Sequence, residues 1–323
     1  MDNAPVLLLG YNRPDKMLQL INALSSTKPQ RLLIGVDGPN STKPADAHLV
    51  KQTQDTIGSI TWPCEIRTRF RPINLGLKNA VVDSVSWAIS EFGQVIVLED
   101  DAIPGPQFVP YACQMLKDYC DAPNIAHING YNIVPKKFIQ QPDIHSRLTR
   151  FPESYAWATW ERAWSSYDDS LDWAVNCPIS KLIEITGSRV NAMRWRLTFR
   201  DAASGRINTW AYRWLATMWS NNWKMLAPNR NLVAYSGWTD GTHTRRKPKW
   251  SELPIKDINF TDKETSIEHV VPDAAADAWL GKKVFGESPF GLAEGIAATI
   301  AMFVLSTGGR ASAANLRDFH ETP

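Results

Sequence analysis

Short apolar segments alternate with longer mixed segments over the first 130 residues of the chain. Five of the short segments, most of them strongly apolar, predict strands at residues 5–10, 31–36, 65–70, 95–98 and 125–129. The longer segments predict helices at about 14–24, 44–57, 78–91 and 106–121. Strands that alternate with helices at this spacing predict an α/β fold with a mostly parallel sheet and right-handed crossovers.

The second part of the chain is marked by tryptophan. Most of the fourteen Trp residues lie between residues 157 and 250. Residues 207–222 predict a helix, because Trp210, Trp214 and Met218 recur every four positions. Residues 135–152 are polar and contain proline, and we expect an irregular boundary loop there. Residues 272–285 predict a short helix. We expect three regions, which are residues 1–130, 131–290 and a C-terminal helix and tail at 291–323.

Composition excludes some classes of protein. The formal net charge of +2 is too small to indicate a nucleic-acid partner. The four cysteines show no zinc spacing, and we expect all of them to be reduced core thiols; Cys113 and Cys120 would share one face of a helix. The first residues lack the basic and apolar regions of a secretory signal, so we expect a cytoplasmic protein.

The C-terminal region contains one apolar segment. Residues 292–306 are apolar but too short to cross a bilayer, so they predict a packing helix. Peripheral docking on the inner face of the membrane is the alternative.

Three carboxylates follow the strand at 95–98 without interruption. Residues 95–105 read Val-Ile-Val-Leu-Glu-Asp-Asp-Ala-Ile-Pro-Gly, which places Glu99, Asp100 and Asp101 at the carboxyl end of a buried strand. Ligands bind at this end of the strands in open α/β sheets. Like charges this close repel each other, and a hard divalent cation compensates them. This favours a metal site, with a polar strand end that starts a loop as the simpler alternative.

Other polar residues follow the remaining strands. Asp37 could accept a hydrogen bond from a nucleobase or could cap its own turn. Arg71 could face a diphosphate or a base, or could lie in solvent. Asn74 and Gly76 would let the backbone approach a ligand closely, although Gly76 could equally mark a turn. Their common position after strands, rather than any single residue, indicates a binding site.

Four motifs together resemble a GT-A-fold nucleotide-sugar glycosyltransferase. They are Asn-Arg-Pro at residues 12–14, Val-Asp-Gly at 36–38, Asn-Leu-Gly-Leu-Lys-Asn at 74–79 and Val-Leu-Glu-Asp-Asp at 97–101. The likeness covers about residues 4–130, and it is strongest to the N-acetylglucosaminyltransferase I-like branch near bacterial family 2-type enzymes. It implies a Rossmann-like nucleotide-sugar-binding half at residues 1–130 and a Trp-rich, acceptor-side half at 131–290.

The resemblance assigns roles to individual residues. Asp101 would bind Mn²⁺ or Mg²⁺, Glu99 and Asp100 would face the ribose and the donor sugar, and Asp37 and Arg71 would lie at the nucleobase. The further donor-binding residues implied by the motifs are Asn12, Arg13, Asn74, Gly76 and Lys78. The resemblance also implies His243, in a Gly-Thr-His-Thr loop before a basic run, as a metal or phosphate ligand, although a single His is often structural.

One position departs from the family. The helix at 207–222 resembles the family's Ser/Thr-Trp-Asp-x-x-Trp element, whose Asp is the expected general base, and this chain has Ala211 there. Another carboxylate could serve, and the candidates are Glu161, Asp201 and Asp240. Alternatively, the base is lost or the register of the comparison is shifted. The Trp-Ala-Thr-Trp segment at 157–160 also resembles the family, and we expect one or two Trp rings to line an acceptor cleft while the rest form core.

The resemblance therefore implies a metal-dependent, inverting glycosyltransferase, with hexosyl or N-acetylhexosaminyl transfer in bacterial polysaccharide biosynthesis. The donor would be a nucleotide diphosphate sugar, and the acceptor would be a hydroxyl of a glycan or glycolipid. Ala211 keeps a non-catalytic nucleotide-sugar or glycan-binding relative as an alternative. A nucleotidyltransferase is a second alternative, but it should carry a glycine-rich basic loop after the first strand, and residues 11–14 read Tyr-Asn-Arg-Pro.

Overall fold

The computed structural model describes residues 4–237, 253–256, 258 and 270–285. Within them an eight-stranded sheet has the order β3-β2-β1-β4-β8-β6-β9-β7, and β5 pairs with β10 in a small second sheet. The strands are β1 Val6–Gly10, β2 Arg31–Val36, β3 Glu65–Phe70, β4 Gln94–Glu99, β5 Ala102–Pro104, β6 Ile125–Asn129, β7 Ser146–Thr149, β8 Ala156–Trp160, β9 Lys224–Pro228 and β10 Val233–Tyr235.

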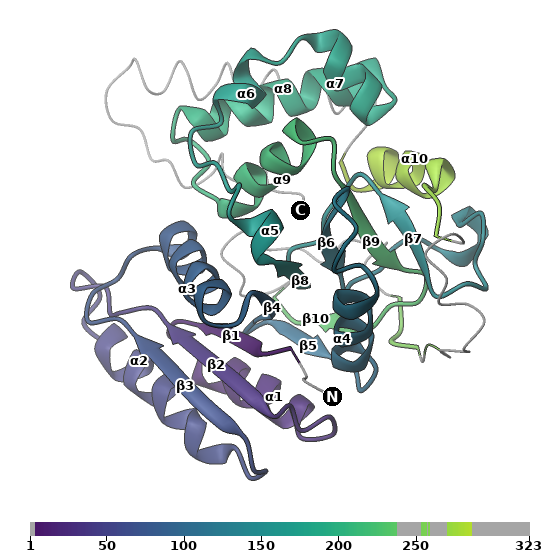
Figure 1. Cartoon of the computed structure of the whole chain (residues 1–323). Coiled ribbons are helices and arrows are strands. Elements are labelled where there is room, and N and C mark those ends of the chain that lie inside the picture. Colours follow the sequence, from purple (N-terminus) through teal and green to yellow (C-terminus); the bar gives the residue numbers. More distant parts are fainter. Residues whose placement is uncertain (1–3, 238–252, 257, 259–269, 286–323) are drawn as a thin grey trace.

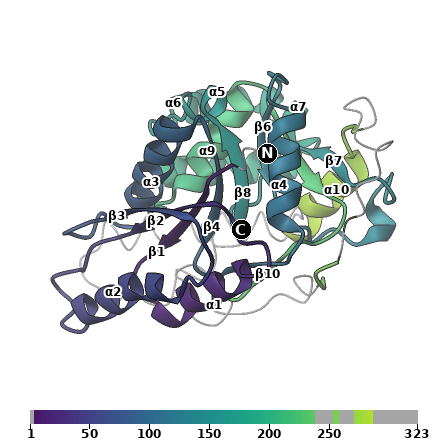
Figure 2. The same ribbon diagram turned by 60° about the horizontal axis from the view of Figure 1, so that its bottom comes forward.

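The helices connect these strands and cover the sheet. They are α1 Pro14–Leu24, α2 Asp46–Asp55, α3 Leu77–Phe92, α4 Phe108–Asp118, α5 Glu161–Trp164, α6 Asp172–Asn176, α7 Ile179–Thr186, α8 Arg189–Ala203, α9 Trp210–Ser220 and α10 Ala274–Lys283, with short 3₁₀ turns at Thr56–Ser59 and Lys136–Phe138. On the β1–β3 side, α3 lies on one face of the sheet, and α1 and α2 lie on the other (Figure 1). Figure 2 shows the same arrangement from below.

The sheet is mixed and mostly parallel. The pairs β1–β2, β2–β3, β1–β4 and β6–β9 are parallel, whereas β8 runs antiparallel to both β4 and β6, and β7 is antiparallel to β9. The predicted α/β class is therefore confirmed. The sheet crosses the boundary expected near residue 130, because β8 lies between β4 and β6.

Two glycines flank helix α3 and mark where it begins and ends. Gly76, just before the helix, has a φ of +76°, and Gly93, just after it, has a φ of +70°. Both values lie in a backbone region that is open to glycine and costly for other residues. The Gly93 N–H donates to Ile89 O at 2.8 Å and satisfies one of the free carbonyls at the helix end. These two glycines therefore set the length of the helix that covers the site.

Most of the tryptophans form core. Trp157 on β8 stacks on His127 and on Trp210, with ring centroids 5.1 Å apart in both pairs. Nine Trp side chains in the described part of the chain are buried, which are Trp62, Trp157, Trp160, Trp164, Trp195, Trp210, Trp214, Trp219 and Trp279. The sequence prediction that most Trp residues are core is confirmed.

The structure corrects two predictions. The loop expected at 135–152 contains β7, which pairs with β9 and so is part of the sheet. The four cysteines are free, but Cys120 lies beyond the end of α4 and is exposed, so it is not a core thiol. The helix expected at 292–306 lies outside the described residues. No helix in the described ranges is both long enough and apolar enough to span a bilayer.

Candidate functional site

A cavity of about 320 Å³ lies at the edge of the sheet where β1, β2 and β4 end. The chain runs from β1 outward to β2 and β3 and then returns to β4 on the other side of β1, so the cavity lies at a topological switch point. Open α/β sheets bind their ligands at this position. The lining residues are Leu9, Gly10, Tyr11, Asn12, Arg13, Gly35, Asp37, Lys43, Arg71, Asn74, Gly76, Leu77, Ala80, Val81, Ser84, Glu99 and Asp100.

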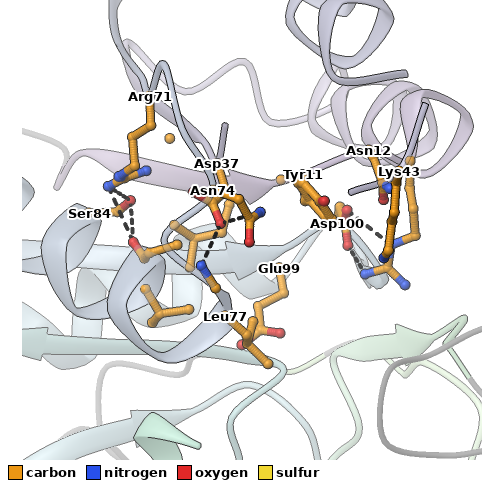
Figure 3. Close-up of a pocket in the computed structure, with 17 residues that line it drawn as sticks. Tyr11, Asn12, Asp37, Lys43, Arg71, Asn74, Leu77, Ser84, Glu99 and Asp100 are labelled. Atoms are coloured by element: carbon orange, nitrogen blue, oxygen red, sulfur yellow. Dashed lines mark hydrogen bonds and ion pairs between the residues drawn. The ribbon is translucent and has the colours of Figure 1, made fainter. Parts of the chain in front are cut away.

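Asp37 organises the middle of the cavity, where Figure 3 shows it facing Asn74. Its Oδ1 accepts from the backbone N–H groups of Gly38 and Leu75, both at 2.9 Å. Its Oδ2 accepts from Asn74 Nδ2 at 3.0 Å and from the Gly76 N–H at 3.1 Å. Four donors nearly fill the acceptor capacity of a carboxylate. Asp37 therefore holds the 74–76 loop, and this loop in turn forms the cavity wall.

Gly38 lets the same loop cross closely. A Cβ on Gly38 would lie 2.3 Å from the carbonyl carbon of Ile73 and 2.5 Å from its nitrogen. Backbone atoms at that distance cannot be avoided by a side-chain rotation, so the loop at residues 71–76 would have to move. A glycine at position 38 is therefore needed for this cavity wall, which explains the Val-Asp-Gly motif in physical terms.

Arg71 lies at one end of the cavity with Ser84 (Figure 3). The buried guanidinium ion-pairs with Asp83 and donates to Ser84 Oγ at 2.9 Å, both on α3. Arg71 is thus not a solvated surface residue. It ties the end of β3 to α3 while it lines the cavity.

Two members of the acidic triplet, Glu99 and Asp100, line the other end of the cavity, whereas the next residue, Asp101, is not part of the lining. The Arg13 guanidinium, at the start of α1, ion-pairs with Asp100 and donates from Nη2 to Asp101 Oδ2 at 3.1 Å. Its Nε also donates to Asp100 Oδ2 at 3.2 Å. The Trp210 indole at the start of α9 lies beside Glu99 and acts to lower its pKa. One arginine therefore contacts two of the three adjoining carboxyl groups, and an indole lies beside the third.

Burial makes these carboxyl groups hard to ionise. It raises the pKa of Glu99 well above the usual range, and the charges of Asp101 and Asp100 raise it further. Burial also raises the pKa of Asp100 to about 7, against the opposing charge of Arg13. The pKa of Asp101 is raised for the same reason, and Arg13 again opposes the shift. Additional positive charge would therefore stabilise the ionised triplet.

Asp101 lies against a second sheet that sequence analysis did not anticipate. The antiparallel pair of β5 and β10 aligns Ala102 with Tyr235. Beyond it the Ser236 N–H donates to Asp101 O at 2.8 Å, and a Cβ on Gly237 would lie 2.6 Å from Asp101 Oδ2. Residues 236 and 237 therefore adjoin the acidic triplet, although no pattern in the sequence signals this pairing.

Asn12 belongs to a second hydrogen-bonded loop. Its side-chain amide donates to Asp46 Oδ1, and Tyr11 Oη donates to Asp46 Oδ2. The Asn40 N–H also donates to Asp46 Oδ2 at 2.6 Å. The buried Asp46 thus fixes the loop after β1, and sequence analysis missed it because it lies within a polar helix that looks solvent-exposed.

Some of the sequence-predicted residues lie elsewhere. Lys78 does not line the cavity and forms an ion pair with Asp169 at 2.6 Å. Glu161 N donates to Gly93 O at 2.7 Å, next to the residue that begins β4. Glu161 thus lies at the start of β4, whereas the acidic triplet begins at its end, and the two ends are roughly 17 Å apart at the usual strand rise. Glu161 is therefore too far away for proton transfer at the acidic triplet. Asp240 and His243 lie outside the described residues.

Neither Asp201 nor Ala211 is suited to act as the general base. Asp201 is buried within α8 and ion-pairs with Arg206. Ala211 follows Trp210 in the first turn of α9, so it lies beside the Glu99 end of the site but carries only a methyl group.

Sequence analysis also missed the buried Glu153 between β7 and β8, since a carboxylate in a polar segment looked solvated. Burial raises its pKa to about 8.

The donor set allows a divalent cation with few protein ligands. No group of three His, Cys, Asp or Glu side chains that could hold a metal forms within residues 4–237 and the other described ranges. However, the buried Asp101 Oδ1 has no hydrogen-bond partner in the described part of the chain. Mg²⁺ is commonly held by one or two carboxylates together with substrate phosphates. Asp101 and its neighbour Asp100 fit that pattern.

Comparison with known proteins gives little beyond the geometry. Neither a protein-family profile nor a curated protein sequence matches the chain. Among solved structures, the chain is similar to the mannosyltransferase PcManGT from Pyrobaculum calidifontis in complex with GDP-mannose and Mn²⁺. The identity is 10%, the TM-score is 0.35, and the match covers 67% of this chain and 73% of the mannosyltransferase chain. At this level of similarity we base no substrate or mechanism on the match.

Proposed function

We propose that this chain is a GT-A-type glycosyltransferase that transfers a sugar from a nucleotide diphosphate sugar to a hydroxyl of a glycan or glycolipid. One observation carries the proposal. The candidate residues that follow four separate strands, at positions 12, 13, 37, 71, 74, 76, 99 and 100, line one cavity at the switch point of the sheet. A cavity at this place, with a cationic side chain next to carboxylates, suits a nucleotide diphosphate.

The donor would lie along the cavity. The base would lie toward Arg71 and the loop held by Asp37, and the ribose and sugar would lie toward Glu99 and Asp100. Asp37 would act on the base through this loop, because its own oxygens already accept four hydrogen bonds. Asp101, whose Oδ1 has no hydrogen-bond partner among the described residues, would hold Mn²⁺ or Mg²⁺, which would supply Lewis-acid stabilisation of the leaving diphosphate.

Three tyrosines gather beside the acidic triplet, next to the small sheet of β5 and β10. The rings of Tyr155 and Tyr235 lie 4.1 Å apart, and Tyr131 meets Tyr155 edge-on at 5.4 Å. Backbone contacts join this cluster to the triplet, since Glu99 N donates to Tyr155 O at 3.5 Å. Flat rings with hydroxyl groups suit a sugar acceptor. We propose that the acceptor binds beside Tyr155 and Tyr235, which are partly exposed, whereas Tyr131 is buried beneath them.

The general base is the open part of the mechanism. Ala211 cannot take a proton, so Asp240 or another carboxylate would have to serve. If the missing carboxylate is the only defect, Ala211→Asp should raise the transfer rate with donor affinity unchanged, because general-base catalysis is worth roughly 10²–10⁴-fold. If the base lies elsewhere, the same substitution should be neutral or harmful. A non-catalytic relative would bind the donor without turnover.

A panel of nucleotide sugars, including GDP-mannose, with Mn²⁺ tests the proposal. Wild-type protein should release nucleoside diphosphate from at least one donor, and Asp101→Asn should abolish this release. Asp143→Asn, which changes an exposed carboxylate that pairs with Lys136, is the control and should behave like wild type. Pyrophosphate release from a nucleoside triphosphate and a sugar phosphate would instead identify a nucleotidyltransferase. Failure to bind any nucleotide sugar would refute the proposal.

A further inference from the structure

A single arginine joins the two aspartates of the acidic triplet. Arg13 Nη2 contacts both Asp100 and Asp101, and Nε contacts Asp100 as well. The arginine comes from the start of α1, while both carboxylates follow β4. Its guanidinium therefore occupies the side of the carboxylates that a metal ion bound by both would need.

The three side chains differ in how firmly they are held. The side chains of Asp100 and Asp101 are only 4% and 7% exposed, and that of Arg13 is 26% exposed. The Asp101 carbonyl accepts from Ser236 N at 2.8 Å and Ser236 Oγ at 3.1 Å, which fixes the backbone at the triplet. Arg13 reaches the carboxylates only through a long side chain with several rotatable bonds. Arg13 can therefore leave the contact more easily than the carboxylates can.

The contact leaves one oxygen for another cation. Asp101 Oδ2 accepts from Arg13, whereas the buried Asp101 Oδ1 has no partner in the described ranges. The Lys16 ammonium donates to Ser236 O at 3.2 Å, and its charge acts to lower the pKa of Asp101. A divalent ion bound by Asp101 would come within about 2.0–2.6 Å of its carboxylate oxygen, which is closer than Arg13 Nη2 at 3.1 Å, and the ion would repel the guanidinium.

Arg13 also lines the cavity in which the proposed donor lies. A diphosphate bound there is a competing partner for the guanidinium, because arginine forms bidentate pairs with phosphate as well as with carboxylate. Transfer of Arg13 from the carboxylates to the diphosphate would free both aspartates for the metal. The two ligands would then favour each other's binding.

We infer that Arg13 is an internal counter-cation that a divalent metal must displace, and that an anionic diphosphate draws away, so that metal and diphosphate bind cooperatively. The inference rests on the proposed function for its ligands. By linkage, the same coupling acts in both directions, and such couplings are typically about 5- to 150-fold. Arg13 is thus a positioning residue whose removal should affect the two ligands in opposite directions.

The test measures each ligand alone, so that complexes of metal with phosphate in solution do not interfere. Mn²⁺ binding is followed by electron paramagnetic resonance, and inorganic pyrophosphate binding is followed by calorimetry in the presence of a chelator. Arg13→Gln should tighten Mn²⁺ binding by roughly 5- to 150-fold and weaken pyrophosphate binding by a similar factor. Lys51→Gln removes an exposed positive charge that pairs with Asp55 on α2, away from the cavity lining, and is the control. It should leave Mn²⁺ binding unchanged.

The possible results separate the inference from the proposed function. If the Asp101→Asn variant binds Mn²⁺ as tightly as the wild-type protein does, the metal assignment fails and the inference fails with it. If Asp101→Asn removes Mn²⁺ binding but Arg13→Gln does not tighten it, only the inference is overturned. Weakening of both ligands by Arg13→Gln would show a structural role and would overturn it as well.

A second variant covers a failure to fold. If thermal melting shows that Arg13→Gln is unfolded, Arg13→Lys carries the test, because one ammonium cannot contact Asp100 and Asp101 in the arrangement that the guanidinium adopts. The inference requires Arg13→Lys to tighten Mn²⁺ binding, to a smaller extent than expected for Arg13→Gln. Unchanged or weaker Mn²⁺ binding by a folded Arg13→Lys would overturn it.

Discussion

The buried Glu153 should make the stability of this protein fall as the pH rises, and Glu153→Gln should remove that effect. Glu153 lies between β7 and β8, where its N–H donates to Asn129 Oδ1 at 2.9 Å and its carbonyl oxygen contacts His127 Nε2 at 3.1 Å. Burial raises the pKa of its carboxyl group from 4.5 to about 8, and the charge of Arg147 opposes this shift. The Arg147 guanidinium itself donates to Pro228 O at 2.9 Å.

The direction follows from proton binding. The unfolded chain releases the Glu153 proton near pH 4.5, whereas the native state keeps it up to about pH 8. Between these values the native state binds more protons, so stability is lost as pH rises through this window. Since one pKa unit corresponds to about 1.4 kcal/mol, the full shift is worth at most about 5 kcal/mol. Gln resembles the neutral acid and carries no such cost.

Urea unfolding at pH 5 and pH 8, followed by tryptophan fluorescence under reducing conditions, measures the effect. The stability of Glu153→Gln relative to wild type should increase by about 3.5 kcal/mol between the two pH values. Glu184→Gln changes a carboxylate that is 67% exposed and pairs with Lys181, so it should show no such trend. A constant difference between Glu153→Gln and wild type from pH 5 to pH 8 would show that Glu153 is ionised in the native state.

Two further predictions concern the cavity wall and the tryptophan core. Gly38→Ala should cost roughly 1–3 kcal/mol of unfolding free energy and weaken nucleotide binding, because its Cβ meets the Ile73 backbone at 2.3 Å. Gly58→Ala, with no atom within 4 Å of the added Cβ, is the control and should retain both properties. His127 should remain neutral at pH 5.5, since burial lowers its pKa to about 3. Its Nδ1 accepts from Trp214 at 3.1 Å, so nitrogen-15 spectra should show the Nε2–H form, and an imidazolium signal would contradict this.

Local sequence determined the strands and helices of the first part of the chain and the edge where the site lies. The strands predicted at 31–36, 65–70 and 125–129 have these bounds in the structure, and α3 begins and ends at glycines that the sequence displays. Parallel strands that are joined by helices end at one edge. The alternation of strands and helices therefore predicts that the motifs after β1, β2, β3 and β4 lie close together.

Only the tertiary structure decided which side chains neutralise each other. The contact of Arg13 with Asp100 and Asp101 joins residues 87 and 88 positions apart, and Ser236 meets Asp101 across 135 positions. Insertion of β8 antiparallel to β4 also placed Glu161 at the far edge, away from the acidic triplet. Periodicity and turn residues report a segment's own conformation and burial. They do not report partners that depend on how distant segments pack, and those partners determine the charge and the pKa of the site.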